Sequence, residues 1–163
     1  MRFLSCIYGL LNFGLITKHI SYVTLLNTRI VTPLFNSSLT SLHYGSKERR
    51  EFKNEMGIRF LVQDHHCIPY QFRNHKLLKQ TKFNVNCARN IVMMPNRNGL
   101  EQLNLDPNTL VHDGGHPQYN SFVGKELQKI YNEPTIDMKR YKLWLFLHYL
   151  KDNLKYKGNL PWK

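Results

Sequence analysis

The sequence predicts a small α+β domain in which a two-stranded ribbon packs on one helix and further helices flank this core. Two short apolar stretches, 58–63 and 88–95, have the length and composition of buried strands. A helical pattern of apolar residues follows at 117–131. Four of the eight histidines fall in two pairs beside these elements. Because a ribbon and a helix can face one another, they can present metal ligands to a common point.

Three parts are expected along the 163 residues, which suffice for one sizeable core. Residues 1–45 form an N-terminal apolar segment and linker, residues 46–135 a central domain, and residues 136–163 a basic amphipathic helix that packs on it. The uncharged run between Arg2 and Lys18 is too short for a stable membrane span. It has the length of the apolar part of a signal peptide but no small-residue cleavage site, so an accessory amphipathic segment is the alternative.

The central domain is expected to begin with a helix that starts near Ser46 and stops at Gly57. The first strand then leads into the first histidine pair. A short helix is predicted over 73–81, and Pro95 ends the second strand. Turn-forming residues dominate 96–109, which predicts a loop.

Two longer helices complete the domain. Pro117 suits the first position of a helix, where its missing N–H costs nothing, and a last amphipathic helix is predicted over 138–156. The aromatic residues between 144 and 149 are expected mainly in the core, although aromatic side chains among cations can also stack on bases. The apolar positions predicted to face the core are Tyr119, Val123, Leu127, Ile130, Leu143, Leu147, Leu150 and Leu154.

Charge and cysteine content narrow the function class. Lys and Arg total 23 against 11 Asp and Glu, a net charge of +12, which favours a polyanionic partner. A basic surface that serves solubility, or an acidic protein partner, is the alternative. The three cysteines, Cys6, Cys67 and Cys87, are odd in number and lack CxxC spacing. This argues against a disulfide framework and against a Cys-based zinc finger, and favours reduced thiols.

The two histidine pairs are complementary in chemistry. Imidazole is a good ligand for divalent metals such as Zn, Ni, Co and Mn. If one histidine of the adjacent pair His65-His66 binds a metal, the other can project to the opposite side and take a proton from water, as metal-assisted phosphodiester hydrolysis requires. The two glycines between His112 and His116 permit a tight turn that brings both imidazoles to one point.

These residues resemble a known family. The run "DHHCIPYQFRNHKLLKQTKFNVNCARNIVMMPN", followed by "HDGGHPQYNSFVGKELQKIY", is similar to the AHH-type nucleases of the HNH/endonuclease VII (His-Me finger, ββα-metal) superfamily, which occur largely as toxin modules of bacterial secreted polymorphic toxins. The resemblance covers roughly residues 60 to 131. It implies a ββα-metal core with flanking helices.

The resemblance also implies roles for individual residues. His66 corresponds to the general base, and His65, His112 and His116 to the metal ligands. Asn90 corresponds to an asparagine that braces the loop carrying the base. Tyr119 and Asn120 complete the helix motif, where they either contact phosphate or pack.

Departures from the family pattern leave alternatives open. Asp64 stands where the family name implies alanine, and its carboxylate could ligate the metal in place of His65. Ile91 stands where glycine is common, and Cys67 is an unusual neighbour and an alternative soft ligand. His75 is expected to pack or to cap a helix. The cations expected to bind substrate phosphates are Arg73, Lys76, Arg89 and Arg97, unless they are simply solvated.

The sequence thus predicts a metal-dependent endonuclease that hydrolyses DNA, in preference to RNA, with Mg, Mn, Zn or Ni as cofactor. The resemblance implies a secreted or delivered toxin or effector that acts in a target-cell cytoplasm and is neutralised by an acidic immunity protein. Two rival hypotheses are a non-catalytic nucleic-acid-binding protein with a structural metal, and a membrane-surface protein led by residues 3–16.

Overall fold

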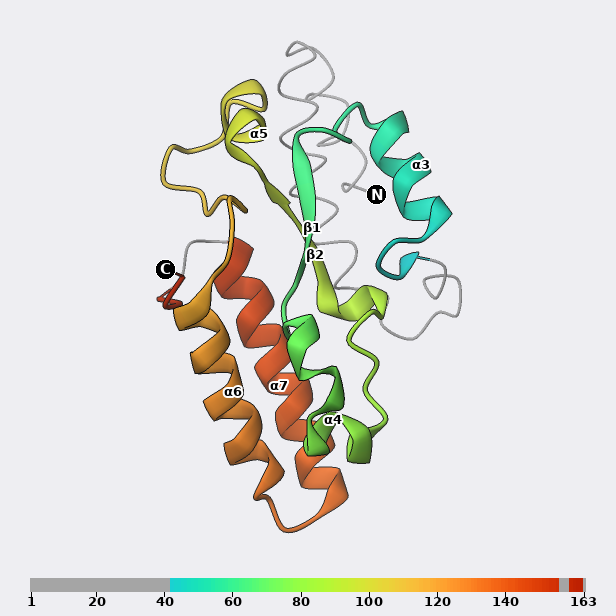
Figure 1. Cartoon of the computed structure of the whole chain (residues 1–163), viewed down its shortest axis with the longest axis vertical. Coiled ribbons are helices and arrows are strands. Elements are labelled where there is room, and N and C mark those ends of the chain that lie inside the picture. The colour runs from blue at the N-terminus through green and yellow to red at the C-terminus, as the bar shows by residue number, and fades with distance from the viewer. Residues whose placement is uncertain (1–41, 156–158, 163) are drawn as a thin grey trace, which may run out of the picture.

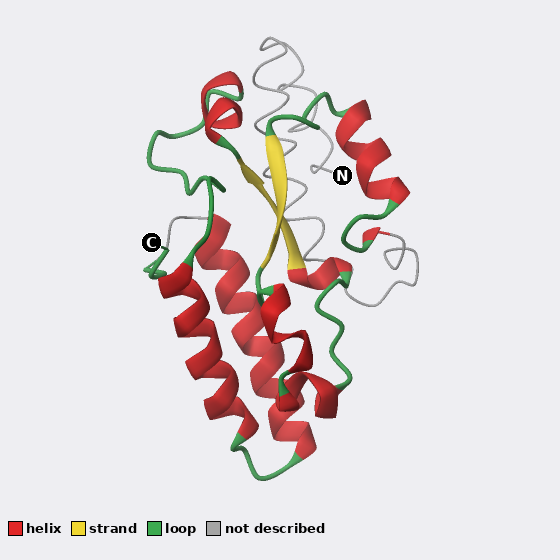
Figure 2. Ribbon diagram, viewed as in Figure 1, coloured by secondary structure: helices red, strands yellow, loops and turns green. Residues whose placement is uncertain are grey.

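The structure, a computed structural model, describes residues 42–155 and 159–162 (Figure 1). The interpretations of the N-terminal segment concern residues that lie almost entirely outside these ranges. The described chain forms two short strands among several helical segments (Figure 2). In order, they are α3 (Lys47–Glu55), β1 (Val62–His66), η2 (Tyr70–Asn74), α4 (Lys76–Thr81), η3 (Ala88–Asn90), β2 (Ile91–Pro95), α5 (Arg97–Gln102), α6 (Pro117–Tyr131) and α7 (Ile136–Lys155).

Strands β1 and β2 form a two-stranded antiparallel ribbon at the centre of the molecule. Val62 pairs with Pro95 at one end, and His66 pairs with Ile91 at the other. All five residues of β2 are buried, whereas in β1 only Val62 and His65 are buried. Because successive side chains of a strand point to opposite faces, His65 and His66 leave β1 in opposite directions.

The main core lies between the ribbon and a layer of three helices, α4, α6 and α7, below it in Figure 1. α7 packs on both α4 and α6, so the C-terminal helix is part of this core. Every apolar position predicted for the two long helices is buried. α6 begins at Pro117, as predicted, and buries its apolar side against the cluster that includes Cys67, Leu77 and Val92. The predicted fold class, a ββα core with flanking helices, is confirmed.

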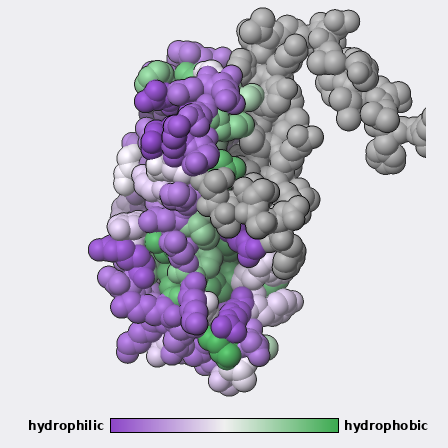
Figure 3. Space-filling view, turned by 90° about the vertical axis from the view of Figure 1, so that its right-hand side faces the viewer, coloured by the Kyte–Doolittle hydropathy of each residue, from purple (hydrophilic) through white to green (hydrophobic). Residues whose placement is uncertain are grey.

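A second, smaller apolar cluster lies at the other end of the ribbon, where α3 and α5 flank it. It joins Ile58, Val62, Met93 and Leu103. The face of the molecule seen in Figure 3 is largely hydrophilic, and an apolar area in its lower half is bordered by hydrophilic side chains. Within the described ranges, no helix combines the length and apolar character that crossing a membrane requires.

The first strand begins later than predicted. Ile58 starts a turn, because its carbonyl accepts hydrogen bonds from the N–H groups of Leu61 and Val62. The partner strand explains the difference, since β2 ends at Pro95 opposite Val62 and the chain then turns into α5. A strand needs a neighbour to satisfy its backbone, and an apolar sequence alone does not supply one.

The predicted loop at 96–109 contains a helix, α5. Asn96 caps this helix, because its side-chain oxygen accepts a hydrogen bond from the N–H of Gly99. Gly99 also lets α5 pack directly against the backbone of Leu61, the residue before β1. A Cβ at position 99 would lie 1.8 Å from the Leu61 carbonyl oxygen. Asparagine and glycine predict turns in a sequence, but here they are a helix cap and a close-packing contact.

The expectation of core placement for the aromatic residues of α7 is wrong for two of the three. Phe146 is buried, but Trp144 and Tyr149 are 46% and 43% exposed. The apolar face of α7 is already supplied by its leucines, so these two rings lie at its margins. Trp144 stacks instead on Tyr141 and contacts His148.

Candidate metal centre and general base

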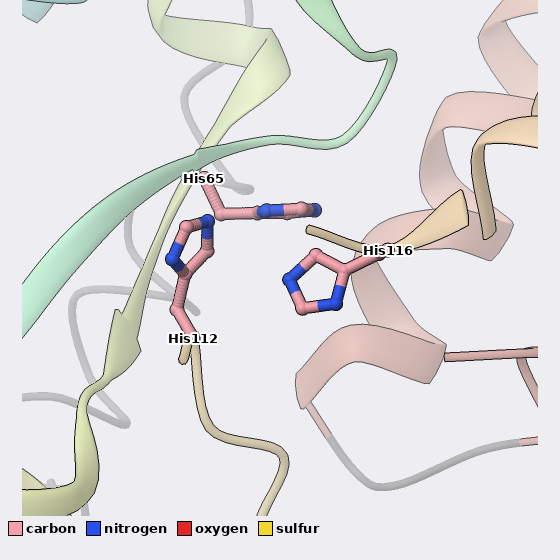
Figure 4. Close-up of side chains that lie close together, drawn as sticks. All are labelled: His65, His112 and His116. Atoms are coloured by element: carbon pink, nitrogen blue, oxygen red, sulfur yellow. The ribbon is translucent and has the colours of Figure 1, made fainter. Parts of the chain in front are cut away.

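Three imidazoles from separate parts of the chain converge at one end of the ribbon. His65 comes from β1, His112 from the loop before α6, and His116 from the start of α6; Figure 4 shows the three rings turned toward one another. One ring nitrogen of each lies within 4.8 Å of one ring nitrogen of each of the others. The ring centroids are 5.1 Å apart for His65 and His112, and 5.8 Å for His65 and His116. Three ring nitrogens this close together could hold one metal ion.

Backbone contacts hold the second histidine pair against the ribbon. The N–H of His112 donates to the carbonyl of Pro95, the last residue of β2, at 2.8 Å. The chain then reverses through Gly114, whose φ of +140° is a conformation that other residues rarely adopt. His116 follows as the N-cap residue of α6 and is held by the helix. The sequence predicts such a tight turn from Gly114 and Gly115, which lie between the two histidines.

Burial favours the neutral form of two of these imidazoles, His65 and His112. His65 is only 6% exposed. Burial, reinforced by His112 and His116, lowers the pKa of His65 from 6.5 to about 3. Burial also lowers the pKa of His112. A neutral imidazole has a lone pair to offer to a metal, and a protonated one does not.

The polar atoms of the cluster fit a metal ion. Two buried ring nitrogens, His65 Nε2 and His112 Nδ1, have no hydrogen-bond partner among the described residues. Buried polar atoms in folded proteins almost always have a partner, so such atoms aimed at one point indicate a ligand. Three nitrogen donors that leave further positions open are typical of catalytic rather than structural zinc-type sites.

His66 lies outside this cluster and has surroundings of its own. Its Nε2 lies 3.0 Å from the side-chain oxygen Oδ1 of Asn86. Its ring is flanked by Tyr44, at a centroid distance of 4.4 Å, and by Tyr70, at 5.9 Å. Because an amide oxygen only accepts, Nε2 carries the proton and donates it to Asn86. The other ring nitrogen, Nδ1, is then a proton acceptor.

Asn90 braces the loop that follows His66. Its Oδ1 accepts from the N–H of Ile68, and its Nδ2 donates to the carbonyls of Ile68 and Val85. Its backbone carbonyl also accepts from the N–H of Cys67. Asn90 is fully buried, so it cannot reach substrate and can act only by holding this loop.

Asp64 does not belong to the three-histidine cluster of His65, His112 and His116. It leaves β1 on the face opposite His65, and its carboxylate forms ion pairs with Arg49 at 2.8 Å and Lys53 at 2.9 Å. Both partners come from α3, and the Arg49 side chain is 1% exposed. The alternative role of Asp64 as a ligand is therefore corrected: it docks α3 on the ribbon. Cys67 is likewise no ligand, because it is buried in the apolar core and burial raises its pKa to about 12.

The residues proposed to bind substrate differ in their exposure to solvent. The four cations are exposed: Arg73, Lys76, Arg89 and Arg97. Tyr119 is instead fully buried, with its hydroxyl donating to the Cys67 carbonyl, so of its two expected roles it takes packing. Asn120 is partly exposed and lies 3.5 Å from Gln71.

Two of the exposed cations lie close to the histidines. Arg97 pairs with Asp113, the residue after His112, at 3.2 Å. Arg73 lies over the ring of Tyr70, which itself flanks His66. Arg97 therefore lies near the three-histidine cluster, and Arg73 lies near His66. His75, for its part, caps α4, as was one of its two expected roles.

Three residues of the site had no signal in the sequence. Tyr44 and Asn86 lie beside His66, and Trp162 covers the three-histidine cluster with its ring centroid 3.7 Å from that of His116. Asn86 is one of several asparagines in a turn-rich stretch, and Trp162 lies far from both histidine pairs along the chain. Only the fold brings them to the site.

Comparison with known protein families gives one result that covers most of this region. A family model described as a nuclease family of the HNH/ENDO VII superfamily with conserved AHH matches residues 47–143. The match begins with α3 and ends within α7. No significant match was found among curated proteins or among solved structures.

Proposed function

Because the chain belongs to the AHH nuclease family of the HNH/ENDO VII superfamily, we propose that it is a metal-dependent endonuclease that hydrolyses DNA. The observation that carries this proposal is the different environment of two adjacent histidines. His65 belongs to a buried three-histidine group suited to a metal. His66 is hydrogen-bonded to Asn86 through Nε2, which leaves Nδ1 to act as a base. Hydrolysis of a phosphodiester needs both functions at neighbouring points.

His65, His112 and His116 are the residues that would hold the metal. A divalent ion bound there would supply a Lewis acid that stabilises charge on the phosphate and on the departing oxygen. Three imidazoles suit zinc, nickel or another first-row transition ion better than magnesium, which prefers oxygen ligands. Of the cofactors expected from the sequence, we therefore favour Zn, Ni or Mn over Mg.

His66 is the proposed general base. Its Nε2–H donates to Asn86, which leaves Nδ1 to take a proton from the attacking water. Tyr44 and Tyr70 restrict the ring from either side, and Tyr44 is itself fixed because its N–H donates to the Asn86 carbonyl. Asn90 holds the loop that follows the base.

The exposed cations would bind the nucleic-acid backbone. Arg97 lies on the side of the metal cluster and Arg73 on the side of His66, so both flank the proposed position of the scissile phosphate. Lys76, Arg89 and Asn120 would extend this contact along the strand. A net charge of +12 supports binding through phosphates, which depends steeply on salt. We favour DNA over RNA because His112 and His116 have the four-residue spacing that resembles the histidine pair of colicin-type DNases in this superfamily.

We further propose that the protein is a toxin or effector nuclease that is delivered into a target cell. An acidic immunity protein would neutralise it there, since a strongly basic enzyme surface is complementary to an acidic inhibitor. The toxin association of AHH-type nucleases supports this proposal. Co-purification with the product of an adjacent small acidic reading frame would test it.

The test of the enzymatic proposal is cleavage by the purified chain. Supercoiled plasmid and total RNA would be incubated with Zn²⁺, Ni²⁺, Mn²⁺ or Mg²⁺, with and without a chelator. Plasmid nicking that requires metal is expected. His66→Ala should lower the rate by about 10²- to 10⁴-fold, because a general base is lost while the metal ligands remain. Metal binding by calorimetry should be unchanged in this variant.

His148→Ala is a matched control, because this histidine lies on α7 in contact with Trp144 and outside the site. It should cleave as the natural chain does. Nucleic-acid binding without cleavage in every metal would contradict the proposal and favour a structural metal in a binding protein. Cleavage of RNA alone would contradict the choice of DNA.

A further inference from the structure

The C-terminal segment of the chain covers the three-histidine cluster. Trp162 is only 8% exposed, and its indole lies against His116, with ring centroids 3.7 Å apart and ring planes 31° apart. The centroid of His65 lies 5.1 Å from the same indole. The family match ends at residue 143, so this segment lies outside the region that defines the family.

Trp162 is also connected to the third histidine. Its Nε1–H donates to the carbonyl of Val111, the residue before His112, at 3.3 Å. The segment itself is anchored, because Leu160 packs on the main core and the indole contacts Tyr119 of α6. One side chain therefore touches two of the imidazoles and holds the backbone beside the third.

These contacts bear on metal affinity in two ways. Stacking limits rotation of the His116 ring, which otherwise costs conformational entropy when a ligand orientation is selected. The indole also forms an apolar wall that excludes water from one side of the cluster, which strengthens electrostatic interactions there. Residues that orient metal ligands from behind typically change affinity by 10- to 100-fold.

We propose that Trp162 is a positioning residue of the metal centre, and that residues 159–162, which lie outside the family match, close one side of the three-histidine cluster. This inference rests on the proposed function in so far as the three histidines bind a metal. It does not depend on the identity of the substrate or on cleavage.

The experiment measures metal binding directly. Zn²⁺ binding would be followed by calorimetry, and Co²⁺ binding by its visible absorption, for the natural chain, Trp162→Ala and Trp162→Phe. Trp162→Ala should bind Zn²⁺ about 10- to 100-fold more weakly, because both the stacking and the apolar wall are lost. Trp162→Phe keeps a stacking ring and loses the N–H, so its loss should be smaller. The Co²⁺ spectrum should change in Trp162→Ala, because the ligands are less constrained.

Trp144→Ala is the matched control. The chain has two tryptophans, and Trp144 is 46% exposed on α7. Its removal should leave Zn²⁺ affinity unchanged. Thermal unfolding of the metal-free variants shows whether each one folds, and Trp162→Phe answers the question if Trp162→Ala does not fold.

Fluorescence gives a second readout on a chain with an intact metal site. Trp144→Phe leaves Trp162 as the one tryptophan in the sequence. Ni²⁺ or Co²⁺, which quench nearby indoles, should then strongly reduce the emission. In Trp162→Phe, where Trp144 alone emits, the same ion should have little effect.

Two results would overturn the inference: equal Zn²⁺ affinity in Trp162→Ala and the natural chain, or no quenching of Trp162 by bound Ni²⁺. Failure of the proposed function has a different signature. A chain whose metal binding depends on Trp162 but which cleaves no nucleic acid would refute the nuclease and leave this inference standing. If the natural chain cleaves nucleic acid but Trp162→Ala binds metal as tightly as the natural chain, the nuclease proposal stands and this inference is refuted.

Discussion

At the scale of single residues, one hydrogen bond determines which nitrogen of His66, the proposed general base, can accept a proton. Asn86 accepts from Nε2 at 3.0 Å, and no other described side chain has a hydrogen bond to this ring. The same asparagine accepts a hydrogen bond from the Tyr44 N–H through its backbone carbonyl, so it holds both the His66 proton and the Tyr44 backbone beside the ring. Asn90, by contrast, acts one step further away, through the loop after His66.

Asn86→Ala should lower kcat by about tenfold, because one hydrogen bond contributes about 1–1.5 kcal/mol and 1.4 kcal/mol is a factor of ten in rate. KM and Zn²⁺ affinity should stay the same, since Asn86 contacts neither substrate phosphates nor the metal cluster. Steady-state kinetics of plasmid nicking would measure this.

Asn86→Asp separates positioning from a general structural effect. A carboxylate oxygen can accept the same hydrogen bond, so this variant should recover most of the lost rate. If both variants lose activity together with thermal stability, Asn86 acts on folding and not on His66.

At the scale of elements, α3 is docked on β1 by buried charge. Asp64 occupies the position of the family's alanine, and it pairs with Arg49, which is 1% exposed. The substitution in the motif is therefore matched by a basic residue on the preceding helix. This pair explains how an acidic residue can stand next to His65, a proposed metal ligand, without joining the three-histidine cluster.

Asp64→Ala restores the alanine of the family motif but should destabilise this protein by about 3–5 kcal/mol. The reason is that Arg49 would be left buried without its counter-charge. Urea unfolding would measure the change in the free energy of unfolding. Zn²⁺ affinity of the folded variant should remain unchanged.

The double variant Arg49→Met/Asp64→Ala tests this explanation. Removing both charges should recover much of the stability, because the unpaired charge is the source of the loss. A single variant with weaker Zn²⁺ binding and normal stability would instead mean that Asp64 serves the metal site.

The turn between His112 and His116 is the second element on which the site depends. Gly114→Ala should cost roughly 1–3 kcal/mol, because a side chain is strained at a φ of +140°. Zn²⁺ affinity should fall as well, since the turn sets the position of His112 against His116. Calorimetry and urea unfolding would measure the two effects.

Gly115→Ala is the control for this turn. The space around either glycine is open, with no atom within 4 Å of an added Cβ, and only Gly114 has a positive φ. Gly115→Ala should therefore be close to neutral. Equal effects of the two substitutions would show that backbone strain at Gly114 is not the cause.

At the scale of the whole molecule, the buried histidines make the metal-free protein sensitive to acid. The pKa of His65 is about 3 in the folded chain and 6.5 when unfolded. Between these values the unfolded chain binds more protons than the folded chain, so the free energy of unfolding falls as pH falls. His112 acts in the same direction, because its pKa is also lowered.

Between about pH 7 and about pH 5, His65 alone should reduce the free energy of unfolding by roughly 2 kcal/mol. Urea unfolding of the chelator-treated protein at several pH values would measure the slope. In His65→Gln the slope should be smaller. Equal slopes in the two chains would contradict the burial of a neutral His65.

The sequence by itself determined the two long helices, the ribbon and the pairing of histidine motifs. Pro117 marks the start of α6, and the spacing of Tyr119, Val123 and Leu127 defines its buried face. These features depend on local periodicity and on short motifs, which a linear sequence carries in full. The candidate metal ligands could be named for the same reason.

The tertiary structure alone decided the surroundings of those ligands. It turned Asp64 toward α3, placed Asn86 on His66, and brought Trp162 over His116 although 46 positions separate these two residues in the sequence. Contacts between residues distant along the chain depend on how the elements pack, and no local pattern encodes them. The motif could therefore identify the histidines, while the packing assigned their neighbours.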